Sequence, residues 1–294
     1  MSRTKIEVKL HNSGLKPLVK DKRDFNLQRT FGSIASAPNY DFSIGDPLSL
    51  KQQFDSDFCA AFGIAAASEY QEGVELSPEF QFALIKKITG DPEAWGADLR
   101  TACKSAVKYG SLEKTLAPYT LVNKDRNFLA NLDNWLELKD DKLEEARKHA
   151  KKSFFSVSEG VDIFHNIRTA LWQNIAQKRA IITGMVWRYS WFNNTGLISA
   201  KYEEEGTPHA FIFTGQKIIN GEPHLVAQLS SGRQTGDNGF FYFPKEVVNK
   251  EATFGNFMFV DMPPEIAKFL NDWKLSIKWN WLAKIVVYIK NLFK

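Results

Sequence analysis

The sequence predicts an α+β fold in which a helical lobe precedes an antiparallel β lobe. Up to about residue 180, Ala-rich and amphipathic stretches carry helix caps and stops. Beyond that point, short runs of β-branched and aromatic residues are separated by Gly, Asn and Pro, which is typical of antiparallel strands. With 294 residues, 44% of them hydrophobic, the chain is long enough to bury a core without disulfides.

The first half predicts a series of helices with recognisable ends. The stretch from Cys59 to Gly73 is Ala-rich, which suits a closely packed helix, and Ser56 or Asp57 is the expected N-cap. The next helix is predicted from its terminal residues, which are Ser77 as N-cap, Pro78 at the first position and Gly90 as stop. Further helices are predicted for the segment ending at Gly110, for residues 131–152 and for residues 161–178.

Five later runs predict strands. They read AIITGMVWRYSWF, HAFIFTGQKII, HLVAQL, GFFYF and FGNFMFV. The first fifty residues are polar and interrupted by Gly and Pro, which favours a strap along the surface. We therefore divide the chain into an N-terminal strap (1–50), a two-lobe domain (51–262, with the helical lobe to about 155 and the β lobe from about 156) and a C-terminal amphipathic helix (263–294).

Charge and cysteine content exclude several classes of protein. The net charge is +4, and residues 265–294 carry it with six lysines against two acidic residues, so the rest of the chain is balanced and no nucleic-acid partner is expected. Two cysteines exclude a disulfide-rich scaffold and a four-cysteine metal site. No motif for a metal or a nucleotide cofactor is present, and we expect neither. Without an apolar leader or an apolar run of ~18 residues, the sequence predicts a cytoplasmic protein.

The last thirty residues predict an amphipathic helix with a basic polar face. Apolar residues recur at helical spacing, and lysines lie between them. Two kinds of partner remain open. Docking on protein, either the chain's own domain or a partner subunit, is favoured over a membrane surface, where Trp273, Trp279 and Trp281 would lie at the level of the lipid headgroups.

Three residues are candidates for a catalytic site. Cys59 begins a predicted helix, where unpaired backbone N–H groups and the helix dipole favour the thiolate. Gln53 lies six residues earlier, and its side-chain amide is a candidate oxyanion donor. His209, at the start of an apolar strand, is the candidate base. Cys103 and the other four histidines lack such neighbours and are interpreted as structural or surface residues.

The ordered flanks of these residues resemble the papain-like cysteine peptidases (family C1). The matching stretches are QQFDSDFCAAF, LSPEFQFALIKKITGD, GADLRTACKSAVKYGSLEKTLAPY, GMVWRYSWF, the strand of His209 and GDNGFFYFP. The resemblance covers about residues 20–262 and is greatest to bacterial and phage-type members without a long propeptide. It implies a papain-like two-lobe fold and hydrolysis of a peptide or protein substrate through an acyl-enzyme. Cys59 would attack, His209 would move the proton, and Gln53 with the Cys59 N–H would stabilise the oxyanion.

The pattern departs from the family at the third catalytic position. Leu229 stands where the family has an Asn that orients the histidine, and leucine cannot accept a hydrogen bond. Ser231 stands where the family has a Trp that shields this pair. Ala60 replaces the Trp that usually follows the cysteine, and Pro208 replaces the Gly that usually precedes the histidine.

Two further expectations concern the environment of the thiol and the imidazole. Gln228 neighbours Leu229, but alternation along a strand directs it to the opposite face unless a bulge intervenes. Asp55 and Asp57 are expected to raise the pKa of the Cys59 thiol unless their charges face solvent.

The sequence therefore leaves two main functions open. The first is a cysteine peptidase, because Gln53, Cys59 and His209 are retained. The alternative is a catalytically impaired pseudo-protease that keeps the fold as a structural or binding component of a larger assembly, because the Asn is replaced by Leu229. Acyl transfer to an acceptor other than water would use the same residues as hydrolysis.

Overall fold

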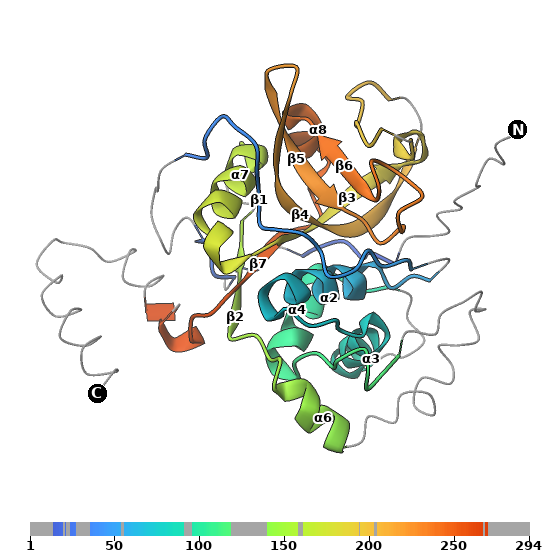
Figure 1. Ribbon diagram of the computed structural model, residues 1–294. Coiled ribbons are helices and arrows are strands. Elements are labelled where there is room, and N and C mark those ends of the chain that lie inside the picture. Colours follow the sequence, from blue (N-terminus) through green and yellow to red (C-terminus); the bar gives the residue numbers. More distant parts are fainter. Residues whose placement is uncertain are drawn as a thin grey trace, which may run out of the picture.

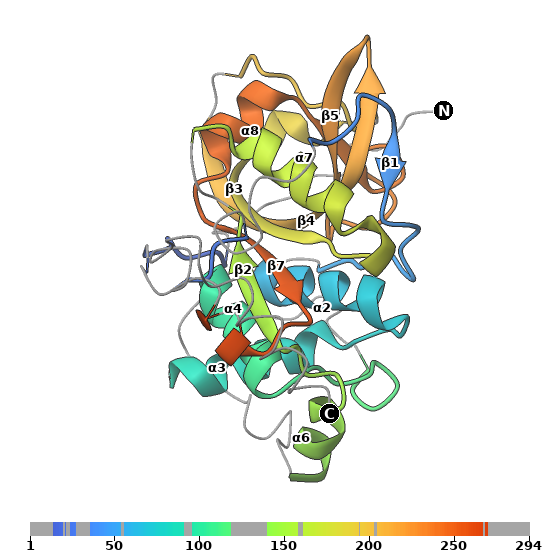
Figure 2. The same cartoon turned by 90° about the vertical axis from the view of Figure 1, so that its left-hand side faces the viewer.

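The computed structural model confirms the α+β architecture (Figure 1). In both views, strands β3 to β6 with helices α7 and α8 form one end of the molecule, and helices α2, α3, α4 and α6 form the other (Figures 1 and 2). The structure describes residues 14–19, 21, 24–27, 36–53, 56–90, 96–118, 140–157, 161–193, 195–202, 205–266 and 268–269.

The helices and strands follow one another as the sequence pattern indicates. The helices are α2 (Cys59–Glu72), α3 (Pro78–Thr89), α4 (Leu99–Lys108), α6 (Asp140–Arg147), α7 (Ile163–Gln173) and α8 (Lys245–Glu251). The strands are β1 (Phe42–Ser43), β2 (Ser153–Ser156), β3 (Ile181–Arg188), β4 (Gly206–Ile219), β5 (Glu222–Gln228), β6 (Phe240–Phe243) and β7 (Asn256–Val260). All five predicted strand runs are confirmed.

The strands form one antiparallel sheet with the order β2-β7-β3-β4-β5-β6, and β1 pairs with β4. Strand β4 is the longest and pairs with β1, β3 and β5. Strand β7, the last strand in the described part of the chain, lies between β2 and β3. Helix α2 packs against β4, so the helix that begins at Cys59 lies directly on the strand that carries His209.

The predicted ends of α3 are confirmed, whereas α7 ends at Gln173 and not at residue 178 as predicted. The Ser77 side chain accepts a hydrogen bond from Phe80 N, Pro78 is the first helical residue, and Gly90 ends α3 in the left-handed conformation. The N-cap predicted for α2 is wrong: the cap is Phe58, without a side-chain hydrogen bond. Ser56 is not available for this role because its hydroxyl donates to the Gln53 carbonyl in the preceding turn.

Other differences concern short or polar segments. Helix α6 ends at Arg147, so residues 148–152 are not helical as predicted, and residues 131–139 lie outside the described part of the chain. Strand β2 and helix α8 were not predicted from the sequence, because four and seven residues are too few to show a periodic pattern.

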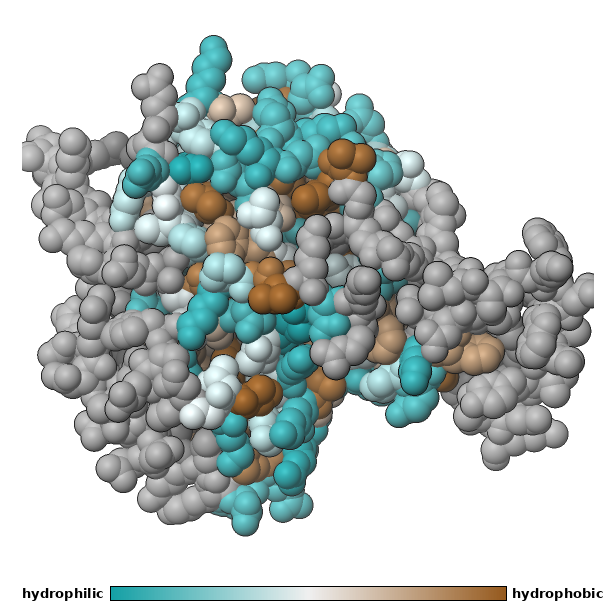
Figure 3. Space-filling model, turned by 180° about the vertical axis from the view of Figure 1, so that it is seen from behind, coloured by the Kyte–Doolittle hydropathy of each residue, from teal (hydrophilic) through white to brown (hydrophobic). Residues whose placement is uncertain are grey.

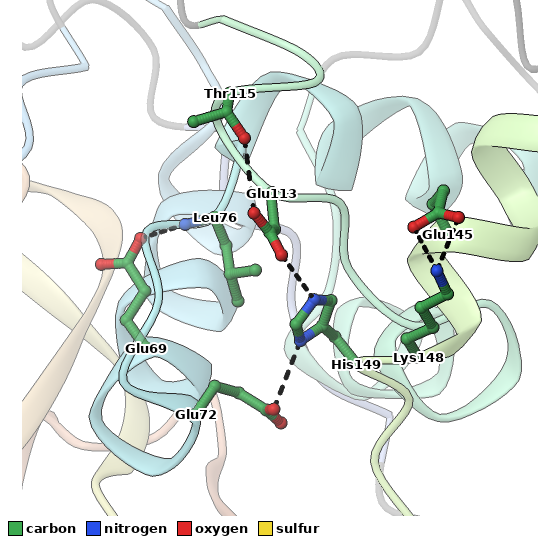
Figure 4. A network of polar contacts seen from close by, with 8 residues as sticks. All are labelled: Glu69, Glu72, Leu76, Glu113, Thr115, Glu145, Lys148 and His149. Atoms are coloured by element: carbon green, nitrogen blue, oxygen red, sulfur yellow. Dashed lines mark hydrogen bonds and ion pairs between the residues drawn. The ribbon is translucent and has the colours of Figure 1, made fainter.

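The helical end is held together by polar contacts between α2 and the segments around α6. The His149 imidazole lies between two carboxylates, with Nδ1 3.3 Å from Glu72 and Nε2 3.5 Å from Glu113 (Figure 4). Lys151 also pairs with Glu72. Burial alone would raise the pKa of Glu72, but the Lys151 and His149 contacts outweigh it and lower the pKa. Three separate segments are therefore joined at the C-terminal end of α2.

The core is rich in aromatic residues, which make up 13% of the sequence. The largest fully buried side chains are Trp187, Trp191 and ten phenylalanines. On the face seen from behind, hydrophobic residues form separate patches among hydrophilic ones (Figure 3). Within the described part of the chain, no helix is long and apolar enough to cross a bilayer. Apart from a few residues near 264–269, the predicted C-terminal helix lies outside the described residues.

Candidate active site

Cys59 is the first residue of α2, and its side chain is fully buried. The thiol lies beside the backbone of Ala210 in β4. Burial raises the pKa of Cys59 to about 12, against the lowering effect of hydrogen bonds from the backbone of Ala210, Ala60 and Cys59 itself. Asp57 contributes to this rise in pKa, as expected from the sequence, and is itself buried. Asp55 lies outside the described residues.

His209 lies in β4 directly before Ala210 and pairs in register with Met185 of β3. The residue is only 4% exposed, and burial lowers the pKa of its imidazole to about 4. The ring packs against Trp187 with the centroids 6.2 Å apart, and against Phe211 at 6.5 Å. The histidine is therefore neutral at pH 7 and lies among aromatic rings.

The structure brings Cys59 next to the residue that follows His209, but it does not join the two side chains. Among the described residues, no hydrogen bond or ion pair connects the thiol and the imidazole. With pKa values of about 12 and about 4, both groups are uncharged at neutral pH. The thiolate–imidazolium pair that makes such a cysteine reactive is absent from this conformation.

Gln53 is held close to the start of α2 by bonds to other partners. Its Nε2 donates to the Ser56 carbonyl at 3.0 Å, and its Oε1 accepts from the Ser230 hydroxyl. Its backbone N–H donates to the Ser230 carbonyl at 2.8 Å. Within the described part of the chain, no hydrogen bond joins Gln53 to Cys59. One of the two side-chain amide hydrogens of Gln53 is thus used in the hydrogen bond to Ser56.

No side chain of residues 228–231 forms a hydrogen bond with His209. Leu229 is 2% exposed and apolar. Gln228 faces α2, as strand alternation predicts, because its Oε1 accepts from the Tyr70 hydroxyl at 2.8 Å. Ser230 bonds to Gln53, and the Ser231 hydroxyl lies 2.8 Å from that of Thr235. A bulge that would turn Gln228 toward His209 does not occur; the irregularity in this strand pair lies at Phe213 to Gly215.

The N-terminal strap contacts the residues just before α2 and the chain before α4. Ala97 N–H donates to the Gly14 carbonyl at 2.6 Å, and Lys16 N–H donates to the Ala97 carbonyl at 3.1 Å, so this stretch pairs in parallel with the chain before α4. A Cβ at Gly14 would lie 1.8 Å from the Asp57 carbonyl oxygen, so only glycine fits there.

Leu15 anchors the same stretch of strap. A Cβ at Gly184 would lie only 2.8 Å from Leu15 Cδ2, and Gly184 is the register partner of Ala210. The leucine therefore sits on the part of β3 that adjoins the thiol site. A pocket of about 300 Å³ opens elsewhere, between the strap, α4 and β2, and neither Cys59 nor His209 lines it.

Three residues around the site were not predicted from the sequence: Leu15, Ala97 and Trp187. The Leu15–Ala97 contact is made by backbone atoms, which leave no side-chain signature. Trp187 is fully buried and covers His209 from β3, whereas the family pattern directs attention to position 231. The alternation of MVWR in the strand run was the available signal, because Met185 and Trp187 share a face with His209. No cluster of metal-ligating side chains occurs in the described segments.

Comparison with solved structures decides the fold. Xylellain, a cysteine protease from Xylella fastidiosa, matches 87% of this chain and 98% of its own, with a TM-score of 0.70 and 20% identity. A procathepsin B from Trypanosoma congolense matches 85% of this chain and 83% of its own (TM-score 0.58, 13% identity). Digestive procathepsin L 3 of Tenebrio molitor larval midgut matches 84% and 73% (TM-score 0.54, 13% identity). The chain has a papain-like fold.

At these identities the likeness establishes the papain-like fold and leaves the chemistry to be argued from the residues. Neither a known family model nor a curated protein matches the sequence. Within the papain-like fold, a cysteine at the start of a helix that packs on the central β-strand lies in a position suited to attack on a carbonyl, since the helix N-terminus stabilises the anion.

Proposed function

We propose that this protein is a cysteine peptidase that cleaves peptide bonds through a Cys59 thioester. The observation that supports it most is the contact between the Cys59 thiol, at the first turn of α2, and the backbone of Ala210, the residue next to His209. The nucleophile and the base lie on two elements that pack against each other. The bacterial and phage-type members of the family remain the relatives that we favour on sequence grounds.

The chemistry follows from the two groups. His209 takes the thiol proton as the Cys59 sulfur attacks the peptide carbonyl carbon, whose oxygen becomes an oxyanion. Backbone N–H groups at the start of α2 and the second amide hydrogen of Gln53 are the candidate donors to that oxyanion. Collapse of the intermediate expels the amine, which takes the proton from His209. His209 then takes a proton from water, whose oxygen attacks the thioester carbon; the C–S bond breaks, the acid is released, and the Cys59 sulfur takes the proton back from His209.

The buried conformation is a resting state in this proposal. Burial is the largest cause of both pKa shifts, raising that of Cys59 and lowering that of His209. Access of water or substrate reduces the desolvation of both groups, so the two pKa values move toward each other and proton transfer becomes easier. Movement of the strap near Leu15 would give that access.

An epoxide or vinyl-sulfone probe tests the proposal on the full chain. We expect labelling that is lost in Cys59→Ala and His209→Gln and retained in Cys103→Ala, which removes the other buried cysteine. Circular dichroism of each variant confirms that it is folded. Labelling that survives in Cys59→Ala would move the site to Cys103.

A second function is favoured by one specific observation. The polar side chains of residues 228–231 all bond to other partners, and Leu229 cannot accept from His209. If the folded protein resists the probe, we infer a pseudo-protease that serves as a binding component of an assembly. In that case the basic C-terminal segment is the proposed attachment, on protein in preference to a membrane surface.

A further inference from the structure

The imidazole of His209 has no hydrogen-bond partner within the described part of the chain, where its contacts are the rings of Trp187 and Phe211. A neutral, buried imidazole tolerates this, but an imidazolium formed during proton transfer does not, because a buried charge needs hydrogen bonds to both nitrogens. One nitrogen faces the thiol proton in the proposed reaction. The other requires an acceptor.

One hydroxyl near His209 is buried and unused. Thr207 Oγ1 has no hydrogen-bond partner within the described part of the structure. Thr207 lies two residues before His209 in β4, so alternation puts both side chains on the same face of the strand, with Cα atoms about 7 Å apart. Its register partner is Trp187, the residue whose ring packs on His209.

The alternatives on the neighbouring strand are already engaged. Gln228 bonds to Tyr70 on the other face, and Ser230 bonds to Gln53. Ser231 bonds to Thr235, although its hydroxyl retains capacity to accept a second bond. Charged groups near this end of the site are Asp57, which acts on Cys59, and Arg188, which pairs with Glu251. Of these groups, only the Ser231 hydroxyl retains capacity as a neutral acceptor, and the Ser231→Ala variant tests it.

We propose that Thr207 is the positioning residue of the site, whose hydroxyl accepts a hydrogen bond from His209 when the imidazole becomes charged. The inference rests on the proposed peptidase function and adds to it the group that replaces the missing Asn. In this proposal, rotation about the Cα–Cβ bond of Thr207 turns Oγ1 toward the imidazole ring. The two side chains lie on the same strand face and together span the distance of about 7 Å between their Cα atoms. The step forms one hydrogen bond, from the imidazolium N–H of His209 to Thr207 Oγ1, and changes no covalent bond.

The test measures alkylation of Cys59 in the full chain by iodoacetamide and by iodoacetate between pH 5 and pH 9, with the labelled peptide quantified by mass spectrometry. Thr207→Val keeps the branched shape and removes the hydroxyl, and Thr207→Ser keeps the hydroxyl. We expect Thr207→Val to slow alkylation about fivefold, as for loss of one hydrogen bond, and Thr207→Ser to retain the rate. The iodoacetate-to-iodoacetamide rate ratio should also fall in Thr207→Val, because the anionic reagent senses the imidazolium.

Matched variants separate the outcomes. Thr214→Val removes another hydroxyl of β4, which bonds weakly to Val226, and should leave the rate ratio unchanged. Equal rates and ratios in wild type and Thr207→Val, with a rate that still depends on His209, overturn the role of Thr207 and leave the peptidase intact. If alkylation of Cys59 slows in Ser231→Ala and not in Thr207→Val, the role belongs to Ser231 and the proposal for Thr207 is wrong. Rates that are the same in His209→Gln and wild type overturn both the peptidase function and this inference.

Discussion

The Leu15 side chain packs on Gly184, the residue of β3 that pairs with Ala210 beside the Cys59 thiol. Leu15 is 4% exposed, although it lies in a segment that the sequence alone identifies only as a polar strap. Its neighbours Gly14 and Lys16 form backbone bonds with Ala97. One apolar side chain and two backbone hydrogen bonds thus hold the strap against the site.

We expect Leu15→Asp to release this strap and expose the thiol. Burying a carboxylate against apolar side chains costs more free energy than the Leu15 contact contributes. Local opening of the strap therefore becomes more frequent. Alkylation of Cys59 should become roughly tenfold faster, measured by mass spectrometry of the labelled peptide. Leu48→Asp, at a position that is already 49% exposed, is the matched control. Unchanged kinetics in Leu15→Asp would mean that the strap does not control access.

Acid should destabilise the protein through His209. Burial lowers its pKa to about 4 from 6.5, so the unfolded chain binds more protons between these values. The contribution is fully present above pH 6.5 and falls as the pH drops, by about 2 kcal/mol at pH 5. Urea unfolding at pH 7.5 and pH 5 measures it, as the difference between wild type and His209→Gln. His224→Gln, on the partly exposed β5, should not reproduce that difference.

Loss of the Tyr70 hydroxyl should affect stability and spare the reactivity of the thiol. Tyr70→Phe leaves the buried Gln228 Oε1 without its donor, which costs about 1–3 kcal/mol in the free energy of unfolding. Denaturant unfolding reports the loss, and the rate of Cys59 alkylation should stay unchanged. A slower reaction that depends on His209 would indicate that Gln228 does reach the imidazole in solution.

The buried ion pair between Lys51 and Glu69 is the most costly single contact to break among these predictions. The atoms are 2.7 Å apart, and both side chains are less than a tenth exposed. Lys51→Met leaves a buried carboxylate unpaired and should lower stability by about 3–5 kcal/mol. Burial already raises the pKa of Glu69, so protonation should make the loss smaller at pH 5 than at pH 8. Lys114→Met, which breaks an exposed pair with Glu75, should cost at most about 1 kcal/mol.

The elements that follow local rules were predictable from the sequence. Ser77, Pro78 and Gly90 specify the ends of α3 because each acts on the backbone within one turn. The long strand run that begins near His209 forms β4 because its β-branched and aromatic residues favour a buried strand. The two segments carrying Cys59 and His209 do pack together, as the resemblance to papain-like enzymes implies.

What escaped prediction depends on contacts distant in sequence. The ring of Trp187 on His209 follows from the register between β3 and β4, and a one-residue slip would turn it to the opposite face. The pairing of the strap with Ala97 uses only backbone atoms. The cap of α2 at Phe58 arises because Ser56 already bonds within the preceding turn. None of these leaves a local pattern in the sequence.

The position of β7 has a consequence for synthesis of the chain. Among the strands of the described residues β7 is translated last, yet it lies between β2 and β3. On the ribosome, the edges of β2 and β3 that pair with β7 therefore remain open until Val260 has emerged, and the sheet closes only then. A chain that stalls earlier presents two open strand edges, which makes truncated products prone to aggregate and dependent on chaperones.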